Sequence, residues 1–371
     1  MKIKVLIIPE SFPTDENPVA GIFIKDQIEA LSKECDVSVF NSNPWYRGVY
    51  EQVDGARFYD FHLFTKRIPT IAKPVGYAWW ESQSLRIAKK IPKPDIIHLH
   101  GAAMRGKWVE KLAAYWGIPY VVTEHTGPWS AISSRARIFA RARQTLANAA
   151  VVMPVSNHLK QEMLDSGVSA KRWEVFGNPV DTEFFSLRNS SLTSSRNILF
   201  LGRLDDFKGG LRTLKAFHKV GDEIPGYRLT IAGTGEESAE IAKYIADNNL
   251  TGRVEFLNQS FSREEMKLLF QQASFLVFPS LFESFGLVAA EAMSTGLPVI
   301  LTDRTGPTDF TSPDVAIAVN PESVDEIGAA MVEMANRLNG FSPSDVREYV
   351  EKKFGFEKYS ENVARIYNDA L

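Results

Sequence analysis

The chain has 371 residues and a formal net charge of −3, with 44% hydrophobic and 23% charged residues. This length suits two domains at roughly 100–200 residues each, and the composition excludes a disordered, collagen-like or coiled-coil chain. No apolar run reaches the roughly 18–20 residues that cross a bilayer, and the first residues enter a strand-like run without a signal-peptide cleavage site. A single cysteine, Cys35, excludes an internal disulfide and fits a reducing cytoplasm.

The net charge is divided unevenly along the chain. Residues 1–188 carry 24 Lys and Arg against 19 Asp and Glu, a balance of +5, whereas residues 189–371 carry 18 against 26, a balance of −8. Surface charge often serves only solvation, but such asymmetry is also compatible with different partners for the two halves.

In the first half, short β-branched apolar runs alternate with amphipathic segments, which is typical of βαβ units around a parallel sheet. Residues 21–32 have an apolar helical face, and the helix predicted over 102–116 ends at Gly117, a natural C-terminal cap. The predicted strands are residues 5–9, 37–41, 96–100, 120–125, 151–156 and 173–176.

The polar, serine-rich residues 186–197 interrupt this alternation and are typical of a linker. A second series of predicted strands follows, at residues 197–202, 228–232, 254–257, 275–279 and 298–302. The last stretch, 343–371, is a helix broken near Phe354-Gly355-Phe356 and long enough to return to the first domain. We therefore predict domains at 1–186 and 196–354, the first completed by the helix at 355–371. Ligands of such sheets bind at the carboxyl ends of the strands, so function is sought in strand-to-helix loops.

The most informative of these loops is PSLFESFGLVAAEAMSTG, residues 279–296. It leaves a strand, passes through Glu283-Ser284-Phe285-Gly286 and enters a helical run at Leu287, whose free N–H groups favour an anionic or hydroxyl-rich ligand. If Glu283 and Glu291 lay on one helix they would be about 12 Å apart, too far for the paired carboxylates of a glycosidase. From spacing alone, a solvated Glu283 before an ordinary capped helix remains an equal alternative.

A second loop carries two cations. In NILFLGRLDDFKGG, residues 197–210, Arg203 and Lys208 follow a predicted strand in a segment that ends in two glycines. An arginine fork and a compact lysine charge together suit a diphosphate, although either residue alone could be an ordinary surface cation.

These two loops resemble the retaining, nucleotide-sugar-dependent glycosyltransferases of family 4, which have the GT-B fold. The pattern P-S-x-x-E-S-F-G-L-x-x-x-E-A-M around Glu283 and Glu291 and the G-R-L-x-x-x-K-G segment carry the resemblance, with LTIAGTGE at 229–236 as a third match. Further matches occur in order at residues 21–31, 95–100, 122–125, 155–156 and 178–184, so the resemblance covers nearly the whole chain.

The resemblance implies an α/β protein of two facing doubly wound Rossmann-like domains with an interdomain cleft, the first binding the acceptor and the second the nucleotide-sugar donor. It also implies that Arg203 and Lys208 stabilise the leaving diphosphate in place of a metal ion, so no metal site and no cofactor are expected. His125 is carried over as the histidine that orients the donor sugar. The expected catalytic residues are His125, Glu283, Arg203 and Lys208, and the expected donor-binding residues are Gly21, Gly202, Arg203, Lys208, Glu283, Ser284, Phe285, Gly286, Leu287 and Glu291.

Three positions depart from the family pattern. Ala20 precedes Gly21 where two glycines are common. The segment Gly306-Pro307-Thr308-Asp309 stands where two glycines followed by a glutamate are common, and Asn258 stands where the family usually has the glycine of an FLG segment. The last change lies near the expected base pocket, so the identity of the base is not readable.

A basic segment, RARIFARAR at residues 135–143, places Arg137 and Arg141 on one helical face. A solvated basic face explains this pattern on composition alone. Because tryptophan and tyrosine are also present in this half, at Trp129, 45–47 and 77–80, we also consider contact with an anionic membrane or a lipid-linked acceptor. His98 and His100 would share one face of a strand, where packing explains them better than a metal does.

The predicted reaction transfers a hexose from a UDP- or GDP-sugar to a hydroxyl of a glycan or lipid-linked acceptor, with retention at the anomeric carbon. Polysaccharide or glycolipid assembly in the cytoplasm, with peripheral contact at the inner face of the membrane, is the setting that the resemblance implies, and no nucleic acid partner is expected. Two alternatives remain: a sugar-nucleotide epimerase of the same fold, and a catalytically silent nucleotide-sugar-binding subunit.

Overall fold

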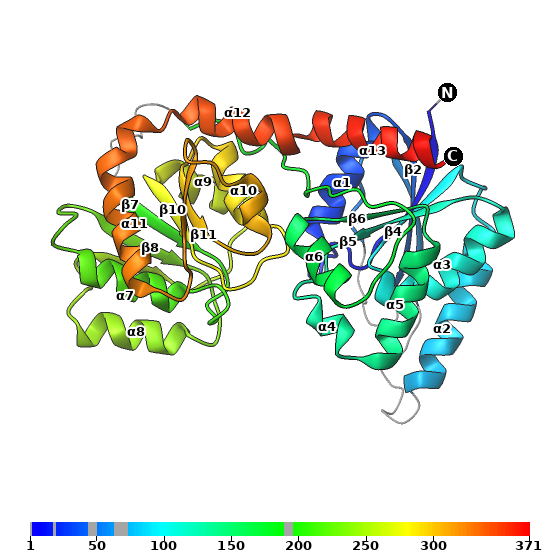
Figure 1. The fold of residues 1–371 in the computed structure, drawn as a ribbon, viewed down its shortest axis with the longest axis horizontal. Coiled ribbons are helices and arrows are strands. Elements are labelled where there is room, and N and C mark those ends of the chain that lie inside the picture. The colour runs from blue at the N-terminus through cyan, green and yellow to red at the C-terminus, as the bar shows by residue number, and fades with distance from the viewer. Residues whose placement is uncertain (1, 18–19, 44–49, 63–72, 189–195) are drawn as a thin grey trace. The chain divides into compact units, whose positions relative to one another are not determined.

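The computed structural model describes residues 2–17, 20–43, 50–62, 73–188 and 196–371 (Figure 1). The chain divides into two compact units, which are described in turn. Unit 1 comprises Met1–Pro179 and Phe356–Leu371, and unit 2 comprises Val180–Gly355.

The division falls at Pro179, before the serine-rich segment, because the residues that follow it pack on unit 2. The backbone N–H of Arg188 donates to the carbonyl of Thr295, and its guanidinium donates to the carbonyl of Ala273 at 2.8 Å. Most of the predicted linker, residues 189–195, lies outside the described residues.

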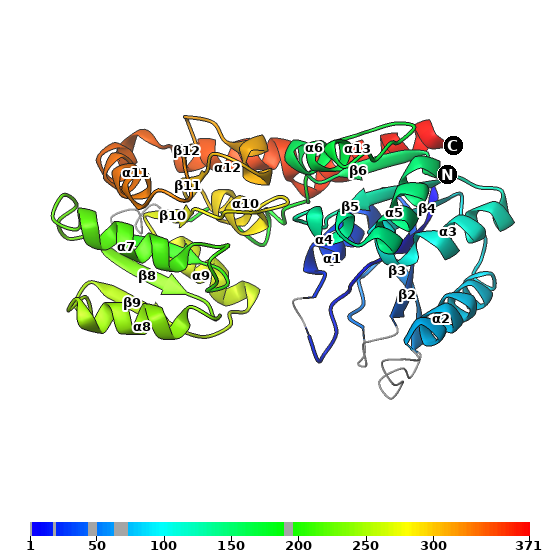
Figure 2. The same cartoon turned by 60° about the horizontal axis from the view of Figure 1, so that its bottom comes forward.

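Unit 1 is built on a six-stranded parallel sheet in the order β3-β2-β1-β4-β5-β6. Helices α1 (Ile22–Ser32) and α13 (Phe356–Ala370) bury their apolar faces against one side of it, where Ile24, Ile28, Val363 and Ile366 join one core. On the other side α3 (Ala102–Trp116) packs beside α5 (Ala136–Asn148) and α2 (Lys73–Ala88) (Figures 1 and 2). The strands are β1 (Lys4–Ile8), β2 (Asp36–Asn43), β3 (Ala56–His62), β4 (Ile96–His100), β5 (Tyr120–Glu124) and β6 (Val151–Pro154), and the remaining helices are α4 (Ser130–Ser133) and α6 (Asn157–Asp165).

Unit 2 repeats this architecture with the order β12-β11-β10-β7-β8-β9, all parallel. Helices α7 (Gly210–Val220) and α11 (Val324–Arg337) lie side by side on one face, where they share a core with α8 (Ser238–Asp247) (Figures 1 and 2). The strands are β7 (Asn197–Leu201), β8 (Arg228–Ala232), β9 (Val254–Leu257), β10 (Phe275–Phe278), β11 (Val299–Thr302) and β12 (Ala316–Val319). The other helices are α9 (Arg263–Gln272), α10 (Leu287–Ser294), η3 (Gly306–Phe310), η4 (Leu338–Gly340) and α12 (Pro343–Phe354).

The structure corrects the strand predictions at both edges of the first sheet and at one edge of the second, where β12 was not predicted. β3 is an edge strand, and its charged Arg57 and Asp60 interrupt the apolar run that is typical of a buried strand. It was therefore not predicted. The strand predicted at residues 173–176 is wrong. This segment runs beside β6 with backbone hydrogen bonds but forms only one bridge, from Trp173 to Val152. The predicted break near Gly355 is confirmed, since α12 ends at Phe354 and α13 begins at Phe356.

Among the described residues, none of the helices combines the length and the apolar character that crossing a membrane requires.

Candidate active site

The two sheets share a strand order that reverses at one point, between β1 and β4 in unit 1 and between β7 and β10 in unit 2. Open α/β sheets bind their ligands outside the carboxyl ends of the strands at this switch point. The loops after β7 and β10 hold Lys208 and Glu283, whereas the loops after β1 and β4 hold Glu10 and Gly101.

In unit 2 an ion pair joins the two switch-point loops. The Lys208 ammonium contacts the Glu283 carboxylate, which also accepts a hydrogen bond from the Ser280 hydroxyl at 3.3 Å. The side chains of Lys208 and Glu283 are 19% and 13% exposed, so both remain accessible to a ligand while being held by protein. A backbone hydrogen bond of 2.7 Å from Leu281 to the Phe207 carbonyl ties the loops together. The structure thus brings two of the predicted catalytic residues into direct contact.

Two helices begin at this point without side-chain caps. Gly209 precedes α7 and Gly286 precedes α10, both with positive φ values of 82° and 97°, and neither helix has an acidic residue in its first turn. A Cβ on Gly209 would lie 2.9 Å from the Pro279 carbonyl oxygen, so only glycine allows the start of α7 to approach the β10 loop this closely. The uncapped N–H groups and the helix dipoles favour an anion at these helix starts.

The other predicted donor-binding residues have more varied settings. Arg203 is 71% exposed at its side chain and pairs with Asp205 at 3.0 Å, so it does not join the Lys208–Glu283 pair. Gly202 packs closely against Gly233, because a Cβ on Gly233 would lie 1.8 Å from the Gly202 carbonyl oxygen. These loops leave the carboxyl ends of β7 and β8, where close backbone approach favours a phosphate-binding surface.

Glu283 and Glu291 do not share a helix. Glu283 precedes the Gly286 cap, whereas Glu291 lies inside α10, is 4% exposed, and has Arg263 of α9 within 3.8 Å. Phe285 between them is 2% exposed and stacks edge-on against Phe354, so its side chain belongs to the core. Ser284 and Leu287, which are partly exposed, therefore form the accessible part of this loop together with Glu283, whereas Gly286 is buried.

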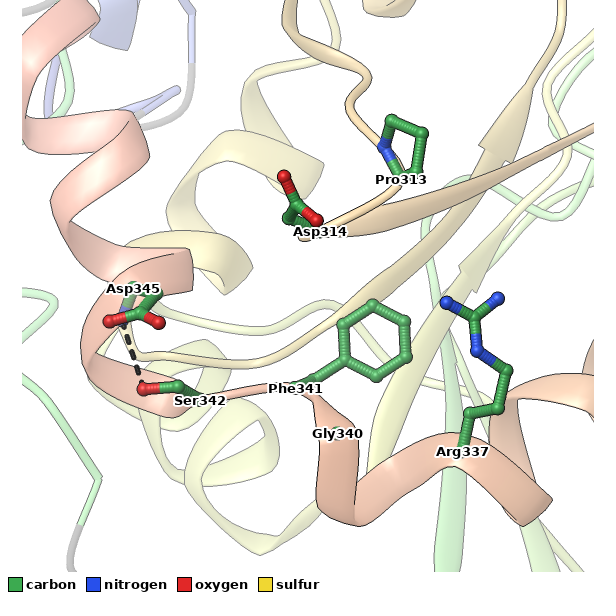
Figure 3. Close-up of a pocket in the computed structure, with 7 residues that line it drawn as sticks. All are labelled: Pro313, Asp314, Arg337, Gly340, Phe341, Ser342 and Asp345. Carbon is green, nitrogen blue, oxygen red and sulfur yellow. Dashed lines mark hydrogen bonds between the residues drawn. The ribbon is translucent and has the colours of Figure 1, made fainter.

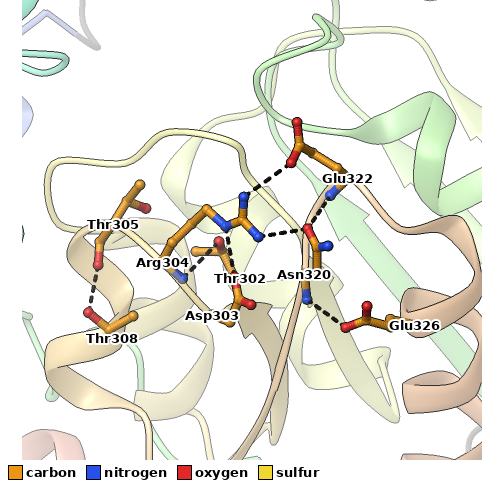
Figure 4. Close-up of polar contacts among 8 residues, drawn as sticks. All are labelled: Thr302, Asp303, Arg304, Thr305, Thr308, Asn320, Glu322 and Glu326. Atoms are coloured by element: carbon orange, nitrogen blue, oxygen red, sulfur yellow. Dashed lines mark hydrogen bonds and ion pairs between the residues drawn. The ribbon is translucent and has the colours of Figure 1, made fainter.

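A polar network supports the neighbouring loop after β11 (Figure 4). The Arg304 guanidinium bonds Asp303 at 2.8 Å, Asn320 at 2.7 Å and Glu322 at 3.1 Å. The loop continues into η3, where a Cβ on Gly306 would stand 2.3 Å from the Ser284 carbonyl oxygen. The network thus fixes the backbone against which the Glu283–Ser284 loop packs, and sequence reasoning did not identify it.

In unit 1 the predicted His125 belongs to a group of three histidines on the side of the sheet that α1 and α13 cover. Its Nε2 lies 3.0 Å from Nδ1 of His100, and Phe23 of α1 packs on its ring with centroids 4.6 Å apart. Burial lowers the pKa of His125 to about 3, and His98 further lowers it, so the ring is neutral near pH 7. His98 contacts Tyr367 of α13 and Thr123, which is the packing role expected for it.

Gly21 caps α1 near this group. Its φ is 72°, and a Cβ there would stand 2.3 Å from the Ser11 carbonyl oxygen, so only glycine fits. The preceding Ala20 shows that a second glycine is not needed for this backbone path.

A cluster that sequence reasoning missed lies beside these residues. Glu10 follows β1, Glu124 ends β5, and Arg105 comes from α3, with Arg105 4% and Glu124 1% exposed. Burial raises the pKa of Glu10 to about 7, with a further rise from Glu124 and an opposing effect of Arg105. The sequence could have indicated this cluster only through position, because Glu10 and Gly101 follow β1 and β4, the two strands between which the strand order reverses.

The basic segment forms part of α5, where Arg137, Arg141 and Arg143 are exposed. Arg141 lies 3.7 Å from Glu81 of α2, and α2 exposes Trp79 (52%) and Val75 (72%). Not all of the aromatic residues predicted to accompany this segment are exposed. Trp129 and Trp80 are buried, and residues 45–47 lie outside the described part of the chain.

A pocket of about 320 Å³ in unit 2 lies apart from these residues, where the segment before β12 meets η4 and the start of α12 (Figure 3). Ser342, which lines it, accepts a hydrogen bond from the Asp345 N–H and so caps α12. The pocket contains none of the predicted site residues.

Two doubly wound parallel sheets, each with the same reversed strand order, define the GT-B class of glycosyltransferase folds. Solved structures agree with this class. The sucrose-phosphate synthase of Thermosynechococcus elongatus has a TM-score of 0.77 at 19% identity, covering 99% of this chain and 98% of that one. HepE of Anabaena, solved in complex with UDP, also has a TM-score of 0.77, at 16% identity and 99% and 100% coverage. The predicted fold class is confirmed.

Family models match both units. The model for Glycosyltransferase Family 4 matches residues 20–184, and that for Glycosyl transferases group 1 matches residues 183–337. The chain therefore belongs to the family 4-like glycosyltransferases.

Curated relatives lie at low to moderate identity. A GDP-mannose:cellobiosyl-diphosphopolyprenol alpha-mannosyltransferase of Xanthomonas campestris is 32% identical over 218 residues, which is 57% of this chain and 57% of that protein. A putative teichuronic acid biosynthesis glycosyltransferase of Bacillus subtilis is 23% identical over 89% of this chain and 88% of its own. The chain thus matches little more than half the length of the first of these relatives.

Proposed function

We propose that this protein is a retaining glycosyltransferase that moves a hexose from a nucleotide diphosphate sugar to an acceptor hydroxyl without a metal ion. The observation that carries the proposal is the Lys208–Glu283 pair between the uncapped starts of α7 and α10. A cation and free helix N–H groups suit the diphosphate, and a carboxylate beside them suits sugar hydroxyls. The UDP found with HepE and the GDP-mannose named for the Xanthomonas relative support a UDP- or GDP-sugar donor.

In this proposal the residues act by position and charge. Lys208 and Arg203 stabilise the negative charge that grows on the departing nucleoside diphosphate, which is the largest electrostatic demand of the reaction. Glu283, with the backbone of Ser284, Gly286 and Leu287, holds the donor sugar, and Glu291 receives the ribose hydroxyls. His125, neutral at pH 7, orients the sugar through a hydrogen bond rather than a charge.

We further propose a glycan or lipid-linked acceptor bound by unit 1, as in polysaccharide or glycolipid assembly, with peripheral contact at the cytoplasmic face of a membrane. The exposed arginines of α5 and the exposed Trp79 of α2 support such contact, because basic and aromatic side chains together bind anionic lipid surfaces.

One assay tests the activity. The purified protein is incubated with UDP-, GDP- and ADP-sugars, with and without alkyl glycosides and prenyl-diphosphate-linked sugars, and the nucleotide and sugar products are followed. Acceptor-dependent nucleotide release with an unchanged anomeric configuration is expected. Conversion of the donor sugar without an acceptor would identify an epimerase, and binding without turnover would identify a silent subunit.

Replacing Lys208 with alanine tests the leaving-group role. We expect kcat to fall by about 10²–10³-fold, because the cation contributes most in the transition state. Lys219→Ala is the matched control, since Lys219 lies on the exposed side of α7 and pairs with Asp325. Full activity of Lys208→Ala would exclude this role, and an inverted product would exclude the retaining mechanism.

A further inference from the structure

The carboxyl edge of unit 1 holds a carboxylate that the proposed mechanism does not use. Glu10 lies directly after β1, and its Oε2 stands where a Cβ on Gly101 would approach within 2.4 Å. Glycine at position 101 therefore leaves the space that the carboxylate occupies. Gly101 has a φ of 75° and caps α3, so its backbone also requires glycine.

The two acids of this cluster differ in their hydrogen bonds. Glu124 accepts from the N–H groups of Ala102 and Thr126, each at 3.1 Å. Within the described part of the chain, no residue donates a hydrogen bond to Glu10. Partial burial weakens the hydration of the Glu10 carboxylate, and because none of the described residues supplies a donor, a donor supplied by a ligand would stabilise it.

Glu10 is also open to such a ligand. The residue is partly exposed, and it lies at the switch point of its sheet. The next residue, Ser11, packs against Gly21. Phe23, two residues after Gly21, packs on the ring of His125. Glu10 thus borders the unit 1 residues that the family resemblance assigns to the donor phosphate and sugar.

We propose that Glu10 binds the acceptor hydroxyl and takes its proton during transfer, an inference that rests on the proposed function. The bond from the anomeric carbon to the diphosphate oxygen breaks with its electron pair going to the diphosphate. The acceptor oxygen forms the new bond to that carbon, and its proton passes to the Glu10 carboxylate. After the product leaves, Glu10 returns the proton to water.

The groups around Glu10 fit this role. Glu124 of β5 and Arg105 of α3 are the charged groups that act on it, and the pKa of Glu10 of about 7 lets it be ionised near neutral pH and still accept a proton. The nearby His125 and His100 have pKa values lowered by burial, so they stay neutral over this range. Arg105 donates to the Ser42 carbonyl at 3.1 Å and, within the described residues, makes no ion pair with the Glu10 carboxylate.

The test is Glu10→Gln, assayed with the donor and the alkyl glycoside or prenyl-linked sugar that give the fastest wild-type transfer. We expect acceptor transfer to fall by at least ~100-fold, because a glutamine cannot take the proton. UDP and GDP binding by calorimetry and acceptor-independent donor hydrolysis should stay within about twofold of wild type, since neither uses the acceptor hydroxyl. Wild-type transfer should rise with pH as Glu10 ionises through about 7, and this rise should be absent in the variant.

Gly101→Ala is a second variant that moves the carboxylate without removing it. The added Cβ would meet Glu10 Oε2 at 2.4 Å, so we expect reduced transfer with nucleotide binding retained. Gly117→Ala is the control, because Gly117 ends the same helix with a φ of 64° and has open space around it. Gly117→Ala also replaces a positive-φ glycine at an end of α3, without a Cβ contact, and should keep wild-type transfer.

The two proposals fail in different ways. If the wild-type protein shows no acceptor-dependent release with any donor, the proposed function fails. If the wild type is active and Glu10→Gln matches it at every pH, or loses nucleotide binding in step with transfer, the assignment of Glu10 is overturned while the function stands.

Discussion

At the scale of single residues, the backbone of unit 2 is strained beside the predicted sugar-binding loop. Thr305, immediately before η3, has a φ of 70° and a ψ of −167°, a region that is essentially reserved for glycine. Thr305 is 5% exposed, and its hydroxyl has no hydrogen-bond partner among the described residues. The Thr305 carbonyl instead accepts from the Thr308 hydroxyl at 2.7 Å (Figure 4), which anchors the turn through the backbone.

Thr305→Gly should therefore stabilise the protein. The substitution keeps the carbonyl bond and removes strain, and the gain exceeds the entropy cost of glycine, so we expect the free energy of unfolding to rise by about 1 kcal/mol. Urea denaturation followed by tryptophan fluorescence measures the change. Thr311→Gly is the control, because Thr311 has an ordinary φ of −86° and should lose stability. A lower urea midpoint for Thr305→Gly would contradict the strain.

Single residues also mark the limit of prediction from sequence. Lys208 and Glu283 were predictable because each stands in a pattern of ordered motifs, and the structure places them in contact. Glu10 was not, because its role is inferred from its contact with Gly101, a residue about ninety positions away in the loop after another strand. The same holds for Arg263 beside Glu291, since a helix register cannot show which neighbouring helix supplies the partner charge.

At the scale of elements, periodic apolar runs predicted the central strands of both sheets, and the errors lie at sheet edges, where β3 and β12 were not predicted. β3 was not predicted because the apolar and polar residues of an edge strand alternate less strictly. Residues 173–176 were wrongly predicted as a strand, because this apolar run forms backbone hydrogen bonds to β6 without a full ladder. The helix break at Gly355 was visible in the sequence, but its consequence, that α13 completes the core of unit 1, depends on contacts far along the chain.

That role of α13 predicts a large effect from one small change. Ile366 is fully buried against the first sheet, so Ile366→Ala should lower the free energy of unfolding of unit 1 by about 2–5 kcal/mol through lost contacts and a cavity. Circular dichroism during urea denaturation measures this loss. Glu361→Ala on the exposed side of α13 should change stability by less than about 0.5 kcal/mol. An effect of Ile366→Ala as small as that of the control would show that α13 does not close the core.

At the scale of the whole molecule, the near-neutral net charge conceals a balance of +5 in residues 1–188 and −8 in residues 189–371. The structure gives this asymmetry a local form in unit 1. α5 exposes Arg137 and Arg141, and α2, which contacts it through Arg141 and Glu81, exposes Trp79. Because Trp129 is buried, the aromatic contribution to this face comes from α2 rather than from the residues before α5.

This face predicts salt-dependent binding to anionic vesicles. The protein should sediment with phosphatidylglycerol vesicles and not with phosphatidylcholine vesicles, and binding should weaken as salt screens the charges. Since each basic residue contributes about 1 kcal/mol near such a surface, Arg137→Ala with Arg141→Ala should weaken binding by about 30-fold. Lys219→Ala with Lys352→Ala, which removes two exposed cations from unit 2, is the matched control and should bind as wild type does. Equal sedimentation with both lipids, or wild-type vesicle binding by the arginine double variant, would show that the arginines of α5 form only a solvated face. The charge asymmetry would then no longer support a membrane-linked acceptor.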